Sequence, residues 1–288
     1  MLDRLVAETD IKLTDGRVLH IYDSFAAGAA RLVVFWHHGT PNIGAPPEPL
    51  FPAAARHGIR WVSYDRPGYG NSTSHRGRDI ASAAADVSDI ADALGIEQFA
   101  VMGHSGGGPH ALACSALLPE RVLGAVCVAG PAPFQAEGLD WFTGMGAFGA
   151  GELRAAAGGR SVLEDYLAAN EFDMDQFTAA DQAALNGDWS WLADVAAQGT
   201  DAGLDGLLDD ELATVAPWGF DPSEISVPVL LLYGCQDRMI PCAHGKWLAR
   251  QGKSATLWLR LDDGHISVLR SAADAIAWLM DHDERLRS

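Results

Sequence analysis

The chain has 288 residues, 48% of them hydrophobic, which is enough to bury a large core, either as one α/β domain or as a core with an insertion. A net charge of −18 disfavours nucleic acid and anionic membranes as partners, because no cluster of lysine or arginine offsets the repulsion. No basic and apolar leader follows Met1, and no apolar run is long enough to cross a bilayer. We therefore expect a cytoplasmic protein that acts on an uncharged small molecule.

The N-terminal part of the chain predicts strands that alternate with helices. Continuous apolar runs indicate strands buried on both faces of a sheet, whereas apolar residues at helical spacing indicate helices that cover it. The expected elements are a β-hairpin, two buried strands and two helices, at residues 11–22, 31–36, 59–64, 46–58 and 80–94. Asp65 and Arg66, directly after the second buried strand, are expected to form an ion pair with a structural role.

The stretch at residues 99–110 carries the most informative pattern. An apolar run ends in Gly-His-Ser-Gly-Gly at 103–107 and then becomes helix-like, which predicts a strand, a tight turn and a helix. A residue held in such a turn needs small neighbours two positions away on each side, and Gly103 and Gly107 stand there. The turn therefore holds Ser105 at the end of the strand, where the N-terminus of the next helix would stabilise negative charge.

This Gly-x-Ser-x-Gly turn resembles the nucleophile elbow of the α/β-hydrolase superfamily. The segment His-Gly-Thr-Pro at 38–41 follows the first buried strand and is similar to the His-Gly-x-Pro loop of the same superfamily. The resemblance implies an oxyanion hole formed by the backbone N–H groups of Thr40 and Gly106. The side chains of His37 and His38 are expected only to hydrogen-bond neighbouring backbone.

Two later motifs supply partners for Ser105. An apolar strand at 227–233 leads to Gly-Cys-Gln-Asp-Arg-Met-Ile-Pro, which resembles the superfamily's acid loop and implies Asp237 as the carboxylate. A final strand at 255–261 leads to His265, the candidate base. Each of the three follows a predicted strand, and the carboxyl ends of parallel strands share one edge of a sheet, so we expect a Ser-His-Asp triad.

The segment at 132–216 lacks a long apolar strand and is rich in alanine and acidic residues, which indicates a helical insertion. In the superfamily such an insertion forms a cap over the nucleophile, so the expected domains are a core at 1–131 and 217–288 and a helical cap at 132–216. Most aromatic rings of the cap should pack in its own core. The candidates for the substrate pocket are Trp141, Phe142, Met145 and Trp189.

The resemblance implies an α/β fold with a mostly parallel eight-stranded sheet, and a serine hydrolase that cleaves a small to medium ester without a metal or organic cofactor. Serine as nucleophile disfavours dehalogenase and epoxide hydrolase activity, because those relatives carry aspartate there. One alternative is an aminopeptidase or amidase of the proline iminopeptidase type, which needs a carboxylate in the cap for the substrate ammonium. Candidates for that carboxylate are Glu137, Asp140, Glu164 and Glu171. Another alternative is a ligand receptor without turnover, and the oligomeric state stays open.

Overall fold

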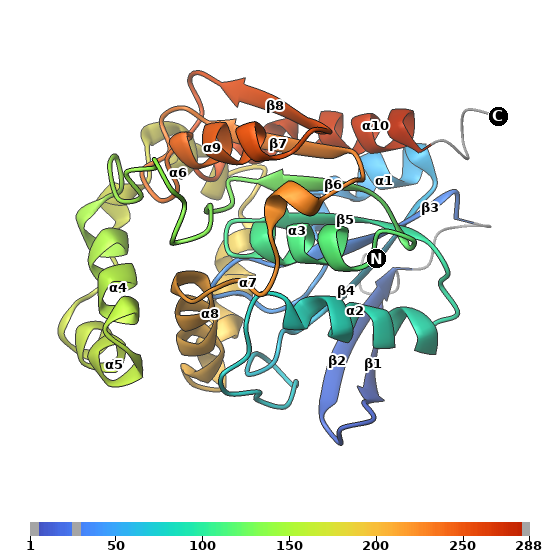
Figure 1. The fold of residues 1–288 in the computed structure, drawn as a ribbon, viewed down its shortest axis with the longest axis horizontal. Helices are drawn as coiled ribbons and strands as arrows, with labels where there is room; N and C mark the ends of the chain where they lie inside the picture. The colour runs from blue at the N-terminus through green and yellow to red at the C-terminus, as the bar shows by residue number, and fades with distance from the viewer. Residues whose placement is uncertain (1–5, 25–29, 284–288) are drawn as a thin grey trace.

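The computed structural model describes residues 6–24 and 30–283, which form an eight-stranded sheet with helices on both faces (Figure 1). The strands are β1 (Val6–Lys12), β2 (Val18–Ser24), β3 (Leu32–His37), β4 (Ile59–Tyr64), β5 (Phe99–His104), β6 (Val122–Val128), β7 (Val229–Gly234) and β8 (Ala255–Arg260). Their order in the sheet is β1-β2-β4-β3-β5-β6-β7-β8. β2 pairs antiparallel with β1 and β4, whereas the other neighbours pair parallel. The predicted fold class is confirmed.

The helices fall into two groups, one around the sheet and one between β6 and β7. The first group is α1 (Phe51–His57), α2 (Ser82–Ala93), α3 (Gly107–Leu117), α9 (Ala243–Gln251) and α10 (Ala272–His282). The second is α4 (Ala147–Ala157), α5 (Arg160–Ala169), α6 (Ala179–Leu185), α7 (Trp191–Asp201) and α8 (Asp205–Val215). Short 3₁₀ helices are η2 (Glu48–Leu50), η3 (Met174–Gln176), η4 (Pro222–Glu224) and η5 (Ser267–Ser271). Within the described ranges, no helix combines the length and the apolar character needed to span a bilayer.

Alternation along the strands sends side chains into two apolar layers. On β5, Met102 packs in a cluster with residues of α1 and α10, whereas Val101 packs in a second cluster with α2, α3 and α9. Successive side chains of a strand point to opposite faces, so both faces of the sheet are covered. Burying one such side chain stabilises the fold by about 1.5–3 kcal/mol. This arrangement explains why the central strands are continuous apolar runs.

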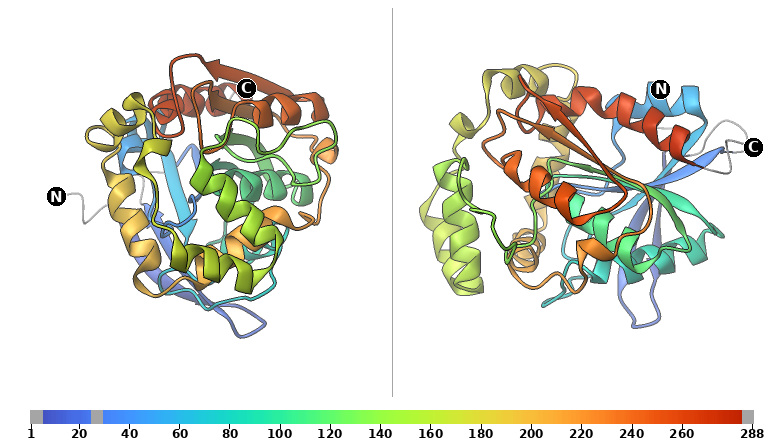
Figure 2. Two further views of the ribbon diagram at one scale, coloured as in Figure 1. Left: turned by 90° about the vertical axis from the view of Figure 1, so that its left-hand side faces the viewer. Right: turned by 45° about the horizontal axis from the view of Figure 1, so that its top comes forward.

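The inserted segment, residues 132–216, lies beyond one end of the sheet. Figure 1 shows α4 and α5 at the left edge of the molecule, with α8 nearer the sheet, and the left view of Figure 2 looks onto this end. Residues of α4, α5 and α8 share their own apolar cluster, which includes Leu153, Leu163 and Leu208. Leu192 and Val195 of α7 instead belong to the cluster that contains β3 residues. One part of the segment thus packs on itself and another part continues the core, and its standing as a separate cap domain stays a prediction.

Candidate active site

Ser105 lies in the turn between β5 and α3 with a φ of 54°, a left-handed conformation that is uncommon for residues other than glycine. Its carbonyl accepts a hydrogen bond from the Gly108 N–H at 2.9 Å, which closes the turn. A Cβ on Gly103 would overlap the backbone of Gly107, and a Cβ on Gly107 would overlap the backbone at the end of β3. Close packing of three backbone segments therefore enforces the two glycines and leaves Ser105 partly exposed at the strand end.

The structure joins Asp237 and His265, which follow β7 and β8. His265 Nδ1 and Asp237 Oδ2 are 2.7 Å apart, and both residues are buried. The other oxygen, Asp237 Oδ1, accepts hydrogen bonds from the N–H groups of Met239 and Ile240 at 2.7 and 2.9 Å. The carboxylate is therefore fixed on both oxygens, and its partner nitrogen takes the proton of the neutral ring. His265 Nε2 is left as the nitrogen that could accept a proton.

Charge around His265 favours its protonated form. Burial alone would lower the pKa of His265, but the charge and hydrogen bond of Asp237, followed by the charge of Asp181, raise it above its ordinary value. The His104 ring lies 4.9 Å from the His265 ring, between centroids, and its Nε2 donates to the His265 carbonyl at 3.1 Å. Burial and the neighbouring His265 lower the pKa of His104 to about 3, so His104 is a neutral neighbour.

Ser105 and His265 follow β5 and β8 at the same edge of the sheet, and His104, the residue before Ser105, contacts the His265 ring. No hydrogen bond joins Ser105 Oγ to the His265 ring in residues 6–24 and 30–283. In enzymes without substrate, catalytic hydrogen bonds are often long and tighten in the substrate complex. The structure thus brings Asp237 and His265 into contact and has Ser105 at the same edge of the sheet, and the assembly of the three as a triad stays a prediction.

Thr40 and Gly106 lie against each other next to the elbow. A Cβ placed on Gly106 would lie 3.5 Å from Thr40 N, so the two main-chain segments are in contact. Within the part of the chain that the structure describes, neither N–H donates a hydrogen bond to another protein group. Two free donors beside a serine could bind the oxygen of a reacting carbonyl.

The histidines before Thr40 serve the structure of this loop. His38 Nδ1 bonds the Gly39 carbonyl at 2.8 Å, and His38 Nε2 accepts the Arg66 N–H at 3.0 Å, in agreement with the expected backbone role. His37 Nε2 lies 3.7 Å from Cys114 Sγ instead. Burial, with the charge of Arg66, lowers the pKa of His37 to about 3 and that of His38 well below the ordinary value, so both rings are neutral.

The expected ion pair between Asp65 and Arg66 is wrong. The Arg66 side chain binds Asp210 of α8, with Nη2 2.5 Å from Oδ2. Asp65 Oδ1 accepts the Gly44 N–H at 2.6 Å and the Tyr22 hydroxyl at 3.1 Å. Adjacent side chains of an extended segment point to opposite sides, so two neighbours in sequence reach different partners.

Asp210 is fully buried and links the inserted segment to residues 38–41, the Thr40 loop. Its carboxylate accepts hydrogen bonds from Thr40 Oγ1 at 2.7 Å, the Tyr69 hydroxyl at 2.8 Å and Arg78 Nη2 at 2.5 Å, besides those from Arg66. Burial alone would raise the pKa of Asp210, but the charges of Arg66 and Arg78 hold it well below the ordinary value. The loop that carries Thr40 is thus tied to a carboxylate 170 positions later in the chain.

Two residues outside the predicted set therefore contact the candidate site: Asp210 binds the Thr40 loop, and Asp181 binds the turn after His265. The spacing of Thr178 and Asp181 matches a capping box at a helix N-terminus, and the structure contains that box at α6. This pattern could have identified Asp181 as ordered, although not its distant partner. Asp210 stands in an acidic run with no such signal.

The candidate pocket residues lie in two different clusters. Phe142, Met145 and Trp141 pack with the cluster of α4, α5 and α8, and the Trp141 indole N–H donates to the Ala132 carbonyl at 3.0 Å. Trp189 is 2% exposed and belongs to the apolar cluster that contains Met102 and residues of α1 and α10. The contact of these four side chains with substrate stays a prediction.

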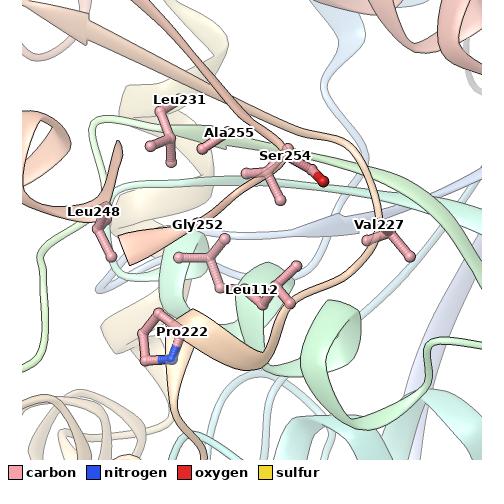
Figure 3. A pocket seen from close by; sticks show the side chains of 10 residues that line it. Leu112, Pro222, Val227, Leu231, Leu248, Gly252, Ser254 and Ala255 are labelled. Carbon is pink, nitrogen blue, oxygen red and sulfur yellow. The ribbon is translucent and has the colours of Figure 1, made fainter. Parts of the chain in front are cut away.

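A small apolar cavity of about 20 Å³ lies away from these residues (Figure 3). It is lined by Leu112, Pro222, Ile225, Val227, Val229, Leu231, Leu248, Gly252, Ser254 and Ala255. Val229 and Ala255 are the first residues of β7 and β8, whereas Asp237 and His265 follow the opposite ends of these strands. The cavity therefore does not belong to the candidate site.

Known proteins similar to this chain share its fold. The sequence model of the family described as "alpha/beta hydrolase fold" matches residues 33–272. Epoxide hydrolase B of Mycobacterium tuberculosis is 32% identical over 163 residues, which are 54% of this chain and 45% of that enzyme, so the match spans about half of each. A 2-hydroxy-6-oxo-6-phenylhexa-2,4-dienoate hydrolase of Burkholderia cepacia is 28% identical over 255 residues, 86% of this chain and 84% of that enzyme.

A solved structure extends the likeness over nearly the whole chain. The thermophilic esterase from Thermogutta terrifontis, in its malate-bound form, superimposes with a TM-score of 0.71 at 18% identity and covers 96% of this chain and 99% of its own. At this identity the likeness concerns the fold. Together with the family match over residues 33–272, it establishes that the chain belongs to the α/β-hydrolase fold family.

Proposed function

We propose that the protein is a serine hydrolase that cleaves carboxylic esters of small to medium, uncharged or apolar molecules by acyl transfer. The observation that carries this proposal is the 2.7 Å hydrogen bond between Asp237 and His265 at the edge where the elbow holds Ser105. A neutral serine hydroxyl is a poor nucleophile and needs an oriented base. His265, with Nδ1 held by a carboxylate and Nε2 free, suits that role.

In the first half-reaction, Ser105 Oγ forms a bond to the ester carbonyl carbon while its proton passes to His265 Nε2. The electron pair of the carbonyl double bond moves onto oxygen, where the N–H groups of Thr40 and Gly106 would stabilise it. The bond to the alcohol then breaks, and the departing oxygen takes the proton from His265. Losing one donor of such an oxyanion hole typically costs about 3 kcal/mol.

In the second half-reaction, a water molecule attacks the acyl-serine and gives its proton to His265 Nε2. The carbonyl is restored as the bond to Ser105 Oγ breaks, and Oγ takes the proton back, which releases the carboxylic acid. Asp237 stays ionised and stabilises the positive ring. Because His265 must be neutral to accept a proton, kcat/KM should rise with pH through a pKa above the ordinary value for histidine.

The experiment that tests this proposal is Ser105→Ala, assayed with p-nitrophenyl esters of increasing acyl length and with a fluorophosphonate probe. We expect turnover to fall by about 10⁴- to 10⁶-fold and labelling to disappear. The matched control is Ser115→Ala, because Ser115 lies on α3 and its hydroxyl only donates to the Ala111 carbonyl at 2.9 Å. An epoxide substrate belongs in the panel, since one relative is named an epoxide hydrolase.

Labelling and turnover that survive in Ser105→Ala would contradict the assignment. Their loss in Ser115→Ala would point to Ser115 instead. Epoxide opening by the wild-type protein, without ester turnover, would contradict the reaction class. The dependence of turnover on acyl length defines the acyl group that the site accepts. A preference for substrates with a free amine would favour an aminopeptidase, the second candidate function below.

A second candidate function is an aminopeptidase, which needs an inward-facing carboxylate for the substrate ammonium. The four acidic residues first considered, Glu137, Asp140, Glu164 and Glu171, are all exposed. Glu152 of α4 and Glu211 of α8 are less exposed than these four, and a bound ammonium would have to offset the burial that favours their neutral forms. Burial raises the pKa of Glu152 to about 7, and burial with the charge of Glu152 raises that of Glu211 well above its ordinary value. Glu211 Oε2 is buried and has no hydrogen-bond partner in the described part of the chain.

The two functions are distinguished by comparing a p-nitrophenyl acyl ester with an aminoacyl p-nitroanilide. An esterase should prefer the ester in the wild-type protein and should keep its KM in Glu211→Gln. An aminopeptidase should prefer the substrate with a free α-amine, and Glu211→Gln should raise its KM by about 10-fold or more, because a neutral amide binds an ammonium less well.

A further inference from the structure

A carboxylate of the inserted segment binds the turn that follows His265. Asp181 lies in the first turn of α6 and is fully buried. Its Oδ1 accepts hydrogen bonds from the N–H groups of Ile266 and Ser267, each at 2.8 Å, and from the Ser267 hydroxyl at 2.9 Å. The donors are thus the two residues directly after the candidate base.

The residue before His265 belongs to the same network. Ser267 Oγ accepts the Gly264 N–H at 2.8 Å, so one hydroxyl connects Gly264 to Asp181. A Cβ on Gly264 would overlap the Asp181 carboxylate, which shows how closely the turn and α6 pack. The backbone on both sides of His265 is therefore bound, directly or through Ser267, to Asp181.

The remaining oxygen of Asp181 is bound within its own helix. Oδ2 accepts the Thr178 N–H at 3.0 Å and the Thr178 hydroxyl at 2.8 Å, which completes the capping box of α6. Burial alone would raise the pKa of Asp181, but the hydrogen bonds from Ser267 and Thr178 lower it below its ordinary value. An ionised carboxylate thus holds the start of α6 and the histidine turn together.

We propose that Asp181 is a positioning residue for His265, through which the inserted segment sets where the imidazole meets Ser105. This inference rests on the proposed function, because it takes His265 as the catalytic base. The contact acts on the backbone of the turn, whereas Asp237 acts on the ring itself. Position matters because misplacing a catalytic group by about 1 Å costs on the order of 100-fold in rate.

The test compares Asp181→Ala with Asp181→Asn in the full chain. Alanine removes every acceptor, whereas asparagine keeps one oxygen for the Ile266 and Ser267 donors and removes the charge. The matched control is Asp173→Ala, because Asp173 lies in the same segment and its exposed carboxylate accepts only the Asp175 N–H, at 2.9 Å. Ester kcat and KM are measured for each variant across the pH range in which histidine titrates.

We expect Asp181→Ala to lower kcat by about 10- to 100-fold and to change KM less than about threefold, because the base moves and the substrate contacts do not. Asp181→Asn should keep kcat within about 10-fold of wild type at high pH. Its acid limb should shift to lower pH, because the substitution removes one of the two charges, those of Asp237 and Asp181, that raise the pKa of His265, and the neighbouring His104 is neutral. Asp173→Ala should match the wild-type protein in both respects.

If Asp181→Ala does not fold, Asp181→Asn and Ser267→Ala test the inference in its place. We expect Ser267→Ala to lower kcat as well, but by less than Asp181→Ala would. A folded Asp181→Ala protein with wild-type kcat and an unshifted pH profile overturns the inference, and so does a rise in KM at constant kcat. Wild-type protein that neither turns over esters nor reacts with the fluorophosphonate overturns the proposed function as well. Normal wild-type turnover with insensitive Asp181 variants overturns this inference alone.

Discussion

The Thr40 loop and the turn around His265 (residues 264–267) are each bound by a carboxylate of the inserted segment, but the two carboxylates have different partners. Asp210 faces two buried guanidinium groups, Arg66 and Arg78. Asp181 accepts its hydrogen bonds from N–H and hydroxyl groups and forms no ion pair with lysine or arginine in the described part of the chain. Removing the first acid leaves buried positive charges without a partner, whereas removing the second leaves uncharged donors. The same contact between two regions therefore has different energetic consequences.

The largest effect is expected for Asp210→Ala. Breaking a buried ion pair from one side typically costs about 3–5 kcal/mol, because the remaining charge is neither solvated nor paired. Asp181→Ala should cost about 1–3 kcal/mol, the range for buried donors that lose an acceptor. Urea unfolding of both variants measures the two free energies. A smaller loss for Asp210→Ala than for Asp181→Ala would reverse the comparison.

Acid should weaken both contacts. The pKa values of Asp181 and Asp210 are lowered in the folded protein, so their contribution to stability is complete above the unfolded pKa of about 3.9 and is lost as pH falls through the folded values. Asp65 and Asp86 act in the opposite sense, because burial raises their pKa values and protonation then favours the folded chain.

The free energy of unfolding, measured from neutral pH down to about pH 3, checks this sign. We expect it to fall more steeply in the wild-type protein than in Asp210→Asn, which has no charge to lose at that position. Parallel curves for the two proteins would mean that Asp210 does not contribute to acid sensitivity.

The smallest effect is expected for Asp205→Asn, at the start of the same helix as Asp210. Asp205 lies 3.2 Å from Arg76 and 3.3 Å from Arg160, but its side chain is 45% exposed. Surface ion pairs contribute about 0–1 kcal/mol, because water solvates both partners after separation. The same urea experiment should show an unfolding free energy close to wild type. A loss as large as that of Asp210→Ala would mean that burial does not explain the difference between the two ion pairs.

The sequence was sufficient to predict the fold class and the strand ends at which the three candidate catalytic residues lie. Glycines at 103 and 107 indicated a strained turn. Each candidate catalytic residue follows an apolar strand that can be recognised without knowing how the inserted segment folds. Local patterns of this kind reflect backbone geometry over a few residues, which is why Ser105, Asp237 and His265 could be assigned to one edge of the sheet.

The contacts of the inserted segment could not be predicted in the same way. In a chain with 38 acidic residues, the capping-box spacing of Thr178 and Asp181 indicates a helix start but not its distant partner, and no local pattern distinguishes Asp210 from a solvated carboxylate. Their partners lie 85 and 170 positions away, and which helix packs on which loop is decided by tertiary structure. For the same reason the pairing of Arg66 was assigned to its sequence neighbour instead of to α8.

The bare backbone at Gly264, where the Asp181 carboxylate lies, bears on attempts to graft a foreign insertion onto this core. A donor segment without an acidic side chain at the matching place would leave the N–H groups of Ile266 and Ser267 without their acceptor, and we expect the turn around His265 to be less well ordered in such a chimera. Recombination of this scaffold should therefore transfer the threonine and aspartate of α6 as one unit with the residues chosen for recognition.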